Sequence, residues 1–418
     1  MTTTQVPQPT RSRPGTGHRT RPSPAGRTAP AVPRQVAFWL LALVLAVTML
    51  GTTLPTPLYV IYQDRWHFSA AMVTVTFAVY AAAVIATLLL AGRSSDLAGR
   101  RPVLAVALGA SALSTVVFIL APGLGALIAA RIVSGLSAGL MTGTATATLT
   151  ELIPASASRR ASLVATAANM AGLGLGPLIA GLFAQYAPHP TTLVFEVYLA
   201  VLAVTALLLL LVPETVRVRT RPALRFAGLG IPDSGRGEFI AAGVAAFSAF
   251  ALLGLFSSLV PGFIAGQLHE GNHAVQGAVL FLLLAVGTVT QVALSRFSSR
   301  RVVVAGLGLF LAALALIVAG LAQSGMALFL AGTVAGGVAV GAIFLGSLAT
   351  ANRLAPAERR GQAISAFFVA CYAGLIIPVV GVGVLSEFTG TFPAVLTFSI
   401  LLAVLCLFSI SRFTQDLT

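Results

Sequence analysis

The sequence contains few charged residues and no lysine. Charged residues make up 9% of its 418 residues, hydrophobic residues make up 57%, and the mean hydropathy is +0.96. Water-soluble domains have roughly 25% charged and about 45 to 50% apolar residues. The composition therefore excludes a water-soluble protein and indicates a chain surrounded by lipid. The absence of lysine fits codon usage in a GC-rich bacterial genome better than a chemical requirement.

The sequence also lacks features of secreted domains and of ATP-driven pumps. Its two cysteines, Cys371 and Cys406, lie within apolar runs and cannot form an extracellular disulfide framework. No nucleotide-binding loop or soluble domain is present, which disfavours a primary pump, so we expect any energy coupling to come from an ion gradient. Intramembrane acids are the usual proton relays, but the candidates here, Glu151, Glu196 and Glu387, lie near the ends of apolar runs.

One metal-site pattern is present but carries little weight. Residues His269 to His273 match H-E-x-x-H, which on a helix would place two histidines on one face for zinc. Gly271 and Asn272 favour a turn instead, and no third ligand follows. We expect no metal, no cofactor and no enzymatic activity.

Twelve apolar runs have about the 20 residues that a membrane-spanning helix needs. They fall into two groups of six, separated by an arginine-rich, proline-containing segment. The runs cover 36–62, 70–91, 103–121, 124–150, 162–186 and 191–212, then 239–263, 274–295, 302–322, 325–350, 362–386 and 391–412.

The N-terminal tail has six arginines, several prolines and no acid, so we expect it to be disordered. A cleaved signal peptide is the alternative, but its apolar region has only about 7 to 15 residues. We divide the chain into a basic tail (1–34), a six-helix bundle (35–212), a linker (213–237), a second six-helix bundle (238–412) and a C-terminal tail (413–418).

The arginines predict the orientation of the spans, because positive charge is retained in the cytoplasm. If the N-terminus is cytoplasmic, 23 of the 25 arginines fall in cytoplasmic segments. The other two are Arg65, in an external loop, and Arg131, inside the fourth span. We expect a multi-pass protein of the bacterial plasma membrane with both termini in the cytoplasm.

The two halves repeat at an offset of about 200 residues. Arg100-Arg101 corresponds to Arg300-Arg301, and Pro177 corresponds to Pro378. Arg159-Arg160 and Gly125 have counterparts at 359–360 and 325. This agreement indicates a duplicated six-helix unit, and six spans per unit give both copies the same orientation, as parallel repeats require.

The loop between spans two and three carries a recognisable motif. It reads Gly92-Arg-Ser-Ser-Asp96-Leu-Ala-Gly99-Arg100-Arg101-Pro102 and resembles the signature loop of the major facilitator superfamily. The resemblance implies a twelve-helix, all-α transporter fold, and it implies that Asp96 helps to close the cytoplasmic side. Two positions depart from the motif, Ser94 and Leu97. The alternative is that the arginines only set topology and Asp96 only caps its loop.

Span four contains Arg131, followed by Gly135 and Gly139 on the same helix face, and this segment resembles a second family motif. Arg131 lies about seven residues, or roughly 10 Å, below the outer surface. It either lines the transport path as a buried charge or snorkels to the outer headgroups. Glu196, at a similar depth in span six, is the best candidate partner.

Span five resembles the Gly-Pro motif of the superfamily's antiporters, many of which export drugs. The matching residues are Gly172, Gly176, Pro177 and Gly181, although Ala180 and Leu163 replace two glycines of the longer pattern. The alternative is a plain packing face with a proline kink.

Together these features predict a secondary transporter with a cavity near the midplane between two bundles. The leading hypothesis is proton-coupled efflux of hydrophobic or amphipathic small molecules by a monomer, with no nucleic-acid partner. The alternatives are uptake of a small solute and a sensor that has lost transport. The polar or aromatic cavity candidates are Tyr59, Tyr80, Asn169, Phe247, Phe250, Gln291, Phe367 and Tyr372.

Overall fold

The computed structural model describes residues 2, 32–91, 94–216, 229–232, 234–356 and 359–415, and within these ranges it contains helices and no strand. Twelve of the helices are long and apolar enough to cross a membrane, which confirms the predicted all-α, twelve-span fold class. Most of the N-terminal tail and part of the linker lie outside the described residues.

The spans form two sets of six. The first set is α1 (Arg34–Thr53), α3 (Ala70–Ala91), α5 (Arg100–Ile119), α6 (Leu124–Leu152), α7 (Ser158–Tyr186) and α8 (Pro190–Leu209). The second set is α9 (Arg236–Ser258), α11 (His273–Leu294), α12 (Ser299–Ala322), α13 (Met326–Leu354), α14 (Arg360–Thr389) and α15 (Thr391–Gln415). The short helices are α2 (Tyr59–Trp66), α4 (Ser94–Ala98), η1 (Ala155–Ala157) and α10 (Val260–Gly266).

Two of the apolar runs are divided between a long helix and a short one. The run 36–62 ends its first helix at Thr53 and turns through 54–58 before α2 begins. Pro55 and Pro57 lie in this turn, and proline cannot donate the amide hydrogen bond that a continuing helix needs. The run 239–263 divides in the same way at Leu259, with Pro261 in the first turn of α10.

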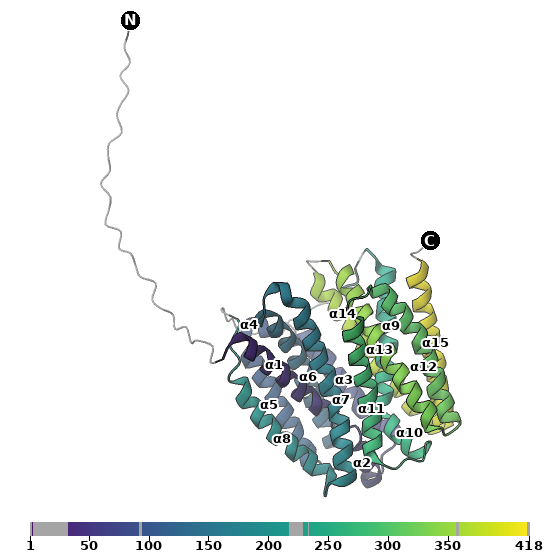
Figure 1. Ribbon diagram of the computed structural model, residues 1–418. Coiled ribbons are helices and arrows are strands. Elements are labelled where there is room, and N and C mark those ends of the chain that lie inside the picture. The colour runs from purple at the N-terminus through teal and green to yellow at the C-terminus, as the bar shows by residue number, and fades with distance from the viewer. Residues whose placement is uncertain are drawn as a thin grey trace.

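The two sets of spans form adjacent bundles (Figure 1). Both the start of α1 and the end of α15 lie on the upper side of this view, which we call the terminal face. Helices α2 and α10 lie at the other end, which we call the opposite face. The closest packing between the bundles is of α7 against α11 and of α3 against α14.

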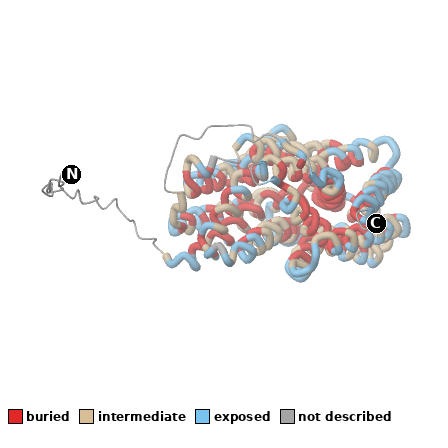
Figure 2. The backbone as a smooth tube through the Cα atoms, turned by 90° about the horizontal axis from the view of Figure 1, so that it is seen from above, coloured by how far each residue is buried: buried red, intermediate tan, exposed pale blue. Residues whose placement is uncertain are grey.

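Buried residues are concentrated inside each bundle and where the bundles meet, whereas exposed residues form the perimeter (Figure 2). Helix α9 is the most enclosed of the twelve described spans, because 83% of an apolar 18-residue stretch of this helix is buried. Many perimeter side chains are large and apolar, including Leu207 and Val289. Such a surface is stable in lipid and would aggregate in water.

Candidate functional site

A cavity of about 190 Å³ lies between the two bundles. Helices α1, α3, α6 and α7 line it from one side and α9, α11, α13 and α14 from the other. Its walls are aromatic, aliphatic and weakly polar, and none of the described lining residues is charged. The aromatic members are Phe77, Tyr80, Phe250, Phe344, Phe368 and Tyr372, and the polar members include Thr53, Thr142, Thr146, Thr166, Asn169 and Ser257.

The structure places four of the eight sequence-selected cavity residues in this central cavity: Tyr80, Asn169, Phe250 and Tyr372. The buried Oδ1 atom of Asn169 has no hydrogen-bond partner among the described residues, so it is free to accept from a bound molecule.

The other four candidates lie elsewhere. Phe247 and Phe367 line a separate apolar groove of α9 and α14, and Gln291 lines a vestibule near the terminal face. Tyr59 lies on α2 and contacts Arg131. Sequence reasoning missed Phe77, Phe344 and Phe368, because a phenylalanine in an apolar run gives no signal of the direction it faces.

The central cavity continues toward the terminal face. The vestibule there has a volume of about 210 Å³ and shares Thr166, Phe344 and Leu348 with the central cavity. Arg159 and Asn352 also line the vestibule, close to the ends of α7 and α13. Together the two spaces form a path from the terminal face to the middle of the protein.

The bundles close the path at the opposite face through small residues. A Cβ atom added to Gly277 of α11 would lie 2.1 Å from the Pro177 carbonyl oxygen of α7. One added to Gly383 of α14 would lie 2.4 Å from the Thr74 hydroxyl of α3. The Glu387 carboxylate also accepts a hydrogen bond from the backbone amide of Ala71 at 3.2 Å. These contacts hold the bundles together on that side, and the pocket found there between α2 and α10 shares no described lining residue with the central cavity.

Arg131 is fully buried beside the central cavity rather than extended to a headgroup. Its Nε donates to the Tyr59 hydroxyl at 2.5 Å, and its Nη1 donates to the Thr52 carbonyl oxygen. The guanidinium carbon lies 5.4 Å from the Tyr80 ring centroid and 5.9 Å from that of Phe77. Cation–π contacts stabilise a desolvated guanidinium. Arg131 is therefore held behind two aromatic side chains of the cavity wall.

The proposed pairing of Arg131 with Glu196 is not present in this conformation. Glu196 is exposed on α8, whereas its neighbours Phe195 and Tyr198 are buried. The helical period therefore points Glu196 away from the bundle interior. No described carboxylate forms an ion pair with Arg131.

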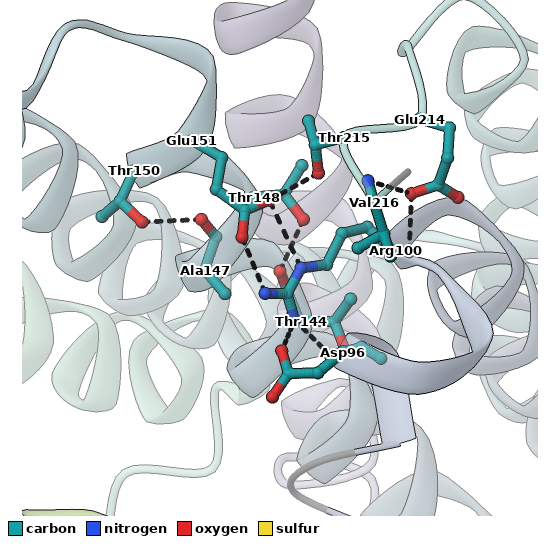
Figure 3. Close-up of polar contacts among 11 residues, drawn as sticks. Asp96, Arg100, Thr144, Ala147, Thr148, Thr150, Glu151, Glu214, Thr215 and Val216 are labelled. Atoms are coloured by element: carbon teal, nitrogen blue, oxygen red, sulfur yellow. Dashed lines mark hydrogen bonds and ion pairs between the residues drawn. The ribbon is translucent and has the colours of Figure 1, made fainter. Parts of the chain in front are cut away.

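The loop motif forms a polar cluster at the terminal face (Figure 3). The Arg100 guanidinium lies 2.6 Å from Asp96, four residues earlier, and donates to Glu151 of α6 at 2.7 Å. A second carboxylate, Glu214, accepts from the backbone amides of Arg100 and Arg101 at 2.9 and 3.2 Å. These contacts connect the starts of α4 and α5 to the ends of α6 and α8.

Other members of the loop motif have simpler roles or lie outside the described residues. Gly99 has a φ of 103°, a backbone conformation that residues other than glycine rarely adopt. Gly92 lies outside the described residues. Glu214 lies in the segment Pro213-Glu214-Thr215 after α8, and its spacing from the loop motif did not indicate that it reaches the start of α5.

The small residues of spans four and five are helix contacts. Gly135 and Gly139 of α6 face α3, where added Cβ atoms would lie 2.4 Å from the Tyr80 carbonyl oxygen and 2.6 Å from the Thr87 Cβ. Gly172 and Gly176 of α7 face α1 within their own bundle, whereas Gly181 and Pro177 face α11 of the second bundle. The Gly-Pro segment of α7 therefore packs against α1 within its own bundle and against α11 across the boundary between the bundles.

The H-E-x-x-H segment is not helical. Residues 269–272 form a loop, and α11 begins at His273 with Asn272 as its N-cap, accepting from the Ala274 amide at 2.9 Å. Glu270 accepts from the amide of Asn272 at 2.9 Å. The two histidines therefore do not share a helix face.

Comparisons with known proteins agree with this architecture. A family model described as Major Facilitator Superfamily matches residues 41–377. A search of curated proteins gave no significant match.

Solved structures resemble the chain at low sequence identity and show the fold alone. The human organic anion transporter MFSD10 (TETRAN) has a TM-score of 0.66 and 17% identity, over 90% of this chain and 100% of that one. A bacterial homologue of the human lysosomal transporter Spinster, inward-facing and unoccupied, has a TM-score of 0.70 and 14% identity, over 92% of this chain and 98% of that one. With the family model matching most of its length, the chain belongs to the Major Facilitator Superfamily and is a multi-pass membrane transporter of small solutes.

Proposed function

We propose that this protein is a secondary active transporter that exports hydrophobic or amphipathic small molecules from a bacterial cell in exchange for protons. The observation that carries the proposal is the central cavity, which continues to the terminal face and is closed at the opposite face. A site between two bundles with one closed side supports alternating access, in which the bundles rock around a fixed site.

The direction of transport depends on which face is cytoplasmic. The arginine distribution favours a cytoplasmic terminal face, because short cytoplasmic loops retain positive charge. In that orientation the cavity is open to the cytoplasm, the state in which an exporter binds its substrate and an importer releases it. The Gly-Pro resemblance of α7 favours export.

The proposed chemistry of substrate binding follows from the cavity walls. Six aromatic rings offer apolar and stacking contacts, and threonine hydroxyls with Asn169 offer a few directional hydrogen bonds. Such a lining suits a compact aromatic molecule better than a sugar, which requires many hydrogen-bonding groups.

Proton coupling in this proposal does not depend on a pair of Glu196 and Arg131. Glu196 is exposed, and the hydrogen-bond partners of Arg131 are Tyr59 and Thr52 instead. We therefore expect Glu196→Gln to retain pH-driven transport. Other candidate proton carriers lie at the two faces and include Asp96 and Glu151 beside Arg100, and Glu387 on the Ala71 amide. Protonation of any of these would weaken a contact that holds helix ends together.

Transport in proteoliposomes under an imposed pH gradient tests the proposal. A panel of lipophilic compounds should include at least one whose efflux is accelerated by the gradient and abolished by a protonophore. Gradient-independent exchange would indicate a uniporter, and accumulation with the gradient would indicate a symporter. Specific binding without any transport would support the sensor alternative instead.

A further inference from the structure

The charged side chains along the path from the terminal face to the central cavity are arginines. Arg159 is the one charged side chain among the described residues that line the vestibule. Deeper in, the Arg131 guanidinium lies against the rings of Phe77 and Tyr80, which line the uncharged cavity. None of the described lining residues of either space is an acid.

The charge of Arg131 is not neutralised within the described part of the protein. Its partners are a hydroxyl and a backbone carbonyl, both without net charge, and no described carboxylate pairs with it. Its Nη2 atom is buried without a hydrogen-bond partner. A buried charge of this kind is normally paired or coordinated. An anion that enters the cavity would supply the missing opposite charge.

The aromatic wall does not remove this field. Phe77 and Tyr80 carry quadrupoles but no net charge, so they stabilise the guanidinium locally and leave its long-range potential. With an effective dielectric constant of about 20, a positive charge at twice the roughly 4 Å separation of a contact ion pair changes the affinity for a unit anion by about 30-fold. It lowers the affinity for a cation by a similar factor.

We propose that this path selects amphipathic anions, with an aromatic body in the central cavity and a carboxylate or sulfonate drawn toward Arg131. The inference rests on the proposed function and narrows its substrate class. Arg159 concentrates anions at the vestibule, because a positively lined cleft with apolar walls raises the local concentration of anions. The same field excludes lipophilic cations, which an aromatic cavity alone would accept.

A matched set of probes tests the charge preference without requiring transport. Naphthylacetate, naphthylacetamide and naphthylethylamine have nearly the same body and differ in charge. Binding is measured by equilibrium dialysis against the full chain in uncharged-lipid nanodiscs, with empty nanodiscs to subtract partition into lipid. We expect naphthylacetate to bind at least tenfold more tightly than the amide and the amine to bind most weakly. Equal affinities, tighter binding of the amine, or no binding of the anion would overturn the inference.

Three substitutions test whether the preference comes from the buried charge. Asn169→Asp places a carboxylate in the cavity wall and should remove most of the anion preference at about pH 8.5, where an ordinary aspartate is ionised. Gln323→Glu makes the same amide-to-carboxylate change on an exposed residue after α12 and should leave the preference as in the wild type. Arg131→Lys should keep the preference, because it keeps the charge. An unchanged preference in Asn169→Asp would contradict the inference even if Arg131 variants fail to fold.

The binding and transport results separate the two proposals. Gradient-driven efflux of the amide and the anion with equal affinity would keep the proposed function and reject the anion preference. Selective anion binding without any transport in proteoliposomes would keep the preference and reject the exporter.

Discussion

Arg131 donates a hydrogen bond from its Nε to the Tyr59 hydroxyl at 2.5 Å, and both side chains are almost completely buried. The bond joins the fourth span to the short helix α2, which follows the proline-containing turn. An arginine at this depth that faced lipid would cost about 2.5 to 3.5 kcal/mol on insertion scales. The hydroxyl, the Thr52 carbonyl and the aromatic rings offset that cost, so α2 is a structural support for the buried cation.

Tyr59→Phe removes this support and should lower the free energy of unfolding by about 1.5 to 3 kcal/mol, the range for a hydrogen bond to a charged group. Tyr62→Phe is the matched control, because the buried Tyr62 hydroxyl has no hydrogen-bond partner in the described structure. Thermal unfolding of the two variants in detergent provides the comparison. Equal stability would show that the Tyr59 bond contributes nothing.

Gly277→Ala should shift the protein away from closure at the opposite face. The added methyl group would lie 2.1 Å from the Pro177 carbonyl oxygen, so α7 and α11 must separate. Gly308→Ala is the control, since a Cβ atom there has nothing within 4 Å. A cysteine at Ser257 in the cavity then reports accessibility from the opposite face. It should label faster in Gly277→Ala, and an unchanged rate would argue that this contact does not close the path.

Asp96→Asn should reduce transport while the amount of protein in the membrane stays the same. A neutral amide is a weaker acceptor than a carboxylate, by roughly a factor of two for a charge-assisted bond. Asp96 is half exposed, so its ion pair with Arg100 contributes at most about 1 kcal/mol to stability. Asp64→Asn, on the exposed side of α2, is the control. Wild-type transport rates in Asp96→Asn would reduce Asp96 to a loop cap.

The orientation predicts which loops react with an impermeant thiol reagent in whole cells. Single cysteines at His189 and His269 should be labelled from outside, and those at Ser156 and Ser298 should react only after permeabilisation. All four positions are exposed, and the native Cys371 and Cys406 are buried. The reverse labelling pattern would place the terminal face outside the cell.

The sequence predicted the span number well and the broken spans poorly. Length and hydropathy are properties of single segments, so twelve spans could be counted without knowing their contacts. The end of α1 at Thr53 depends on Pro55 and Pro57, which the continuous apolar run concealed. Hydropathy alone does not mark where a helix ends, because prolines can break the helix without interrupting the apolar run.

Individual site residues were easiest to select where a charge or a glycine restricts the choice, whereas only four of the eight polar or aromatic cavity candidates line the central cavity. Arg131 and the Arg100 loop are conspicuous because charges are rare in such segments. Glu196 looked equally suitable at the same depth, but depth does not give helix rotation, and Glu196 faces outward. For phenylalanines the difficulty is greater, since both the lipid-facing and the cavity-facing positions accept them.

The most direct test of the central cavity as the transport path compares two neighbouring residues of α6. Thr142 lines the cavity, whereas its neighbour Gly143 is exposed but is not among the described residues that line the cavity or the vestibule, and nothing lies within 4 Å of a Cβ atom added to it. A small water-soluble thiol reagent applied to the terminal face should modify Thr142→Cys rapidly, a transported compound should slow that reaction, and Gly143→Cys should stay unmodified in lipid. Equal modification of both cysteines, or modification of Thr142→Cys only from the opposite face, would contradict a central path that opens at the terminal face.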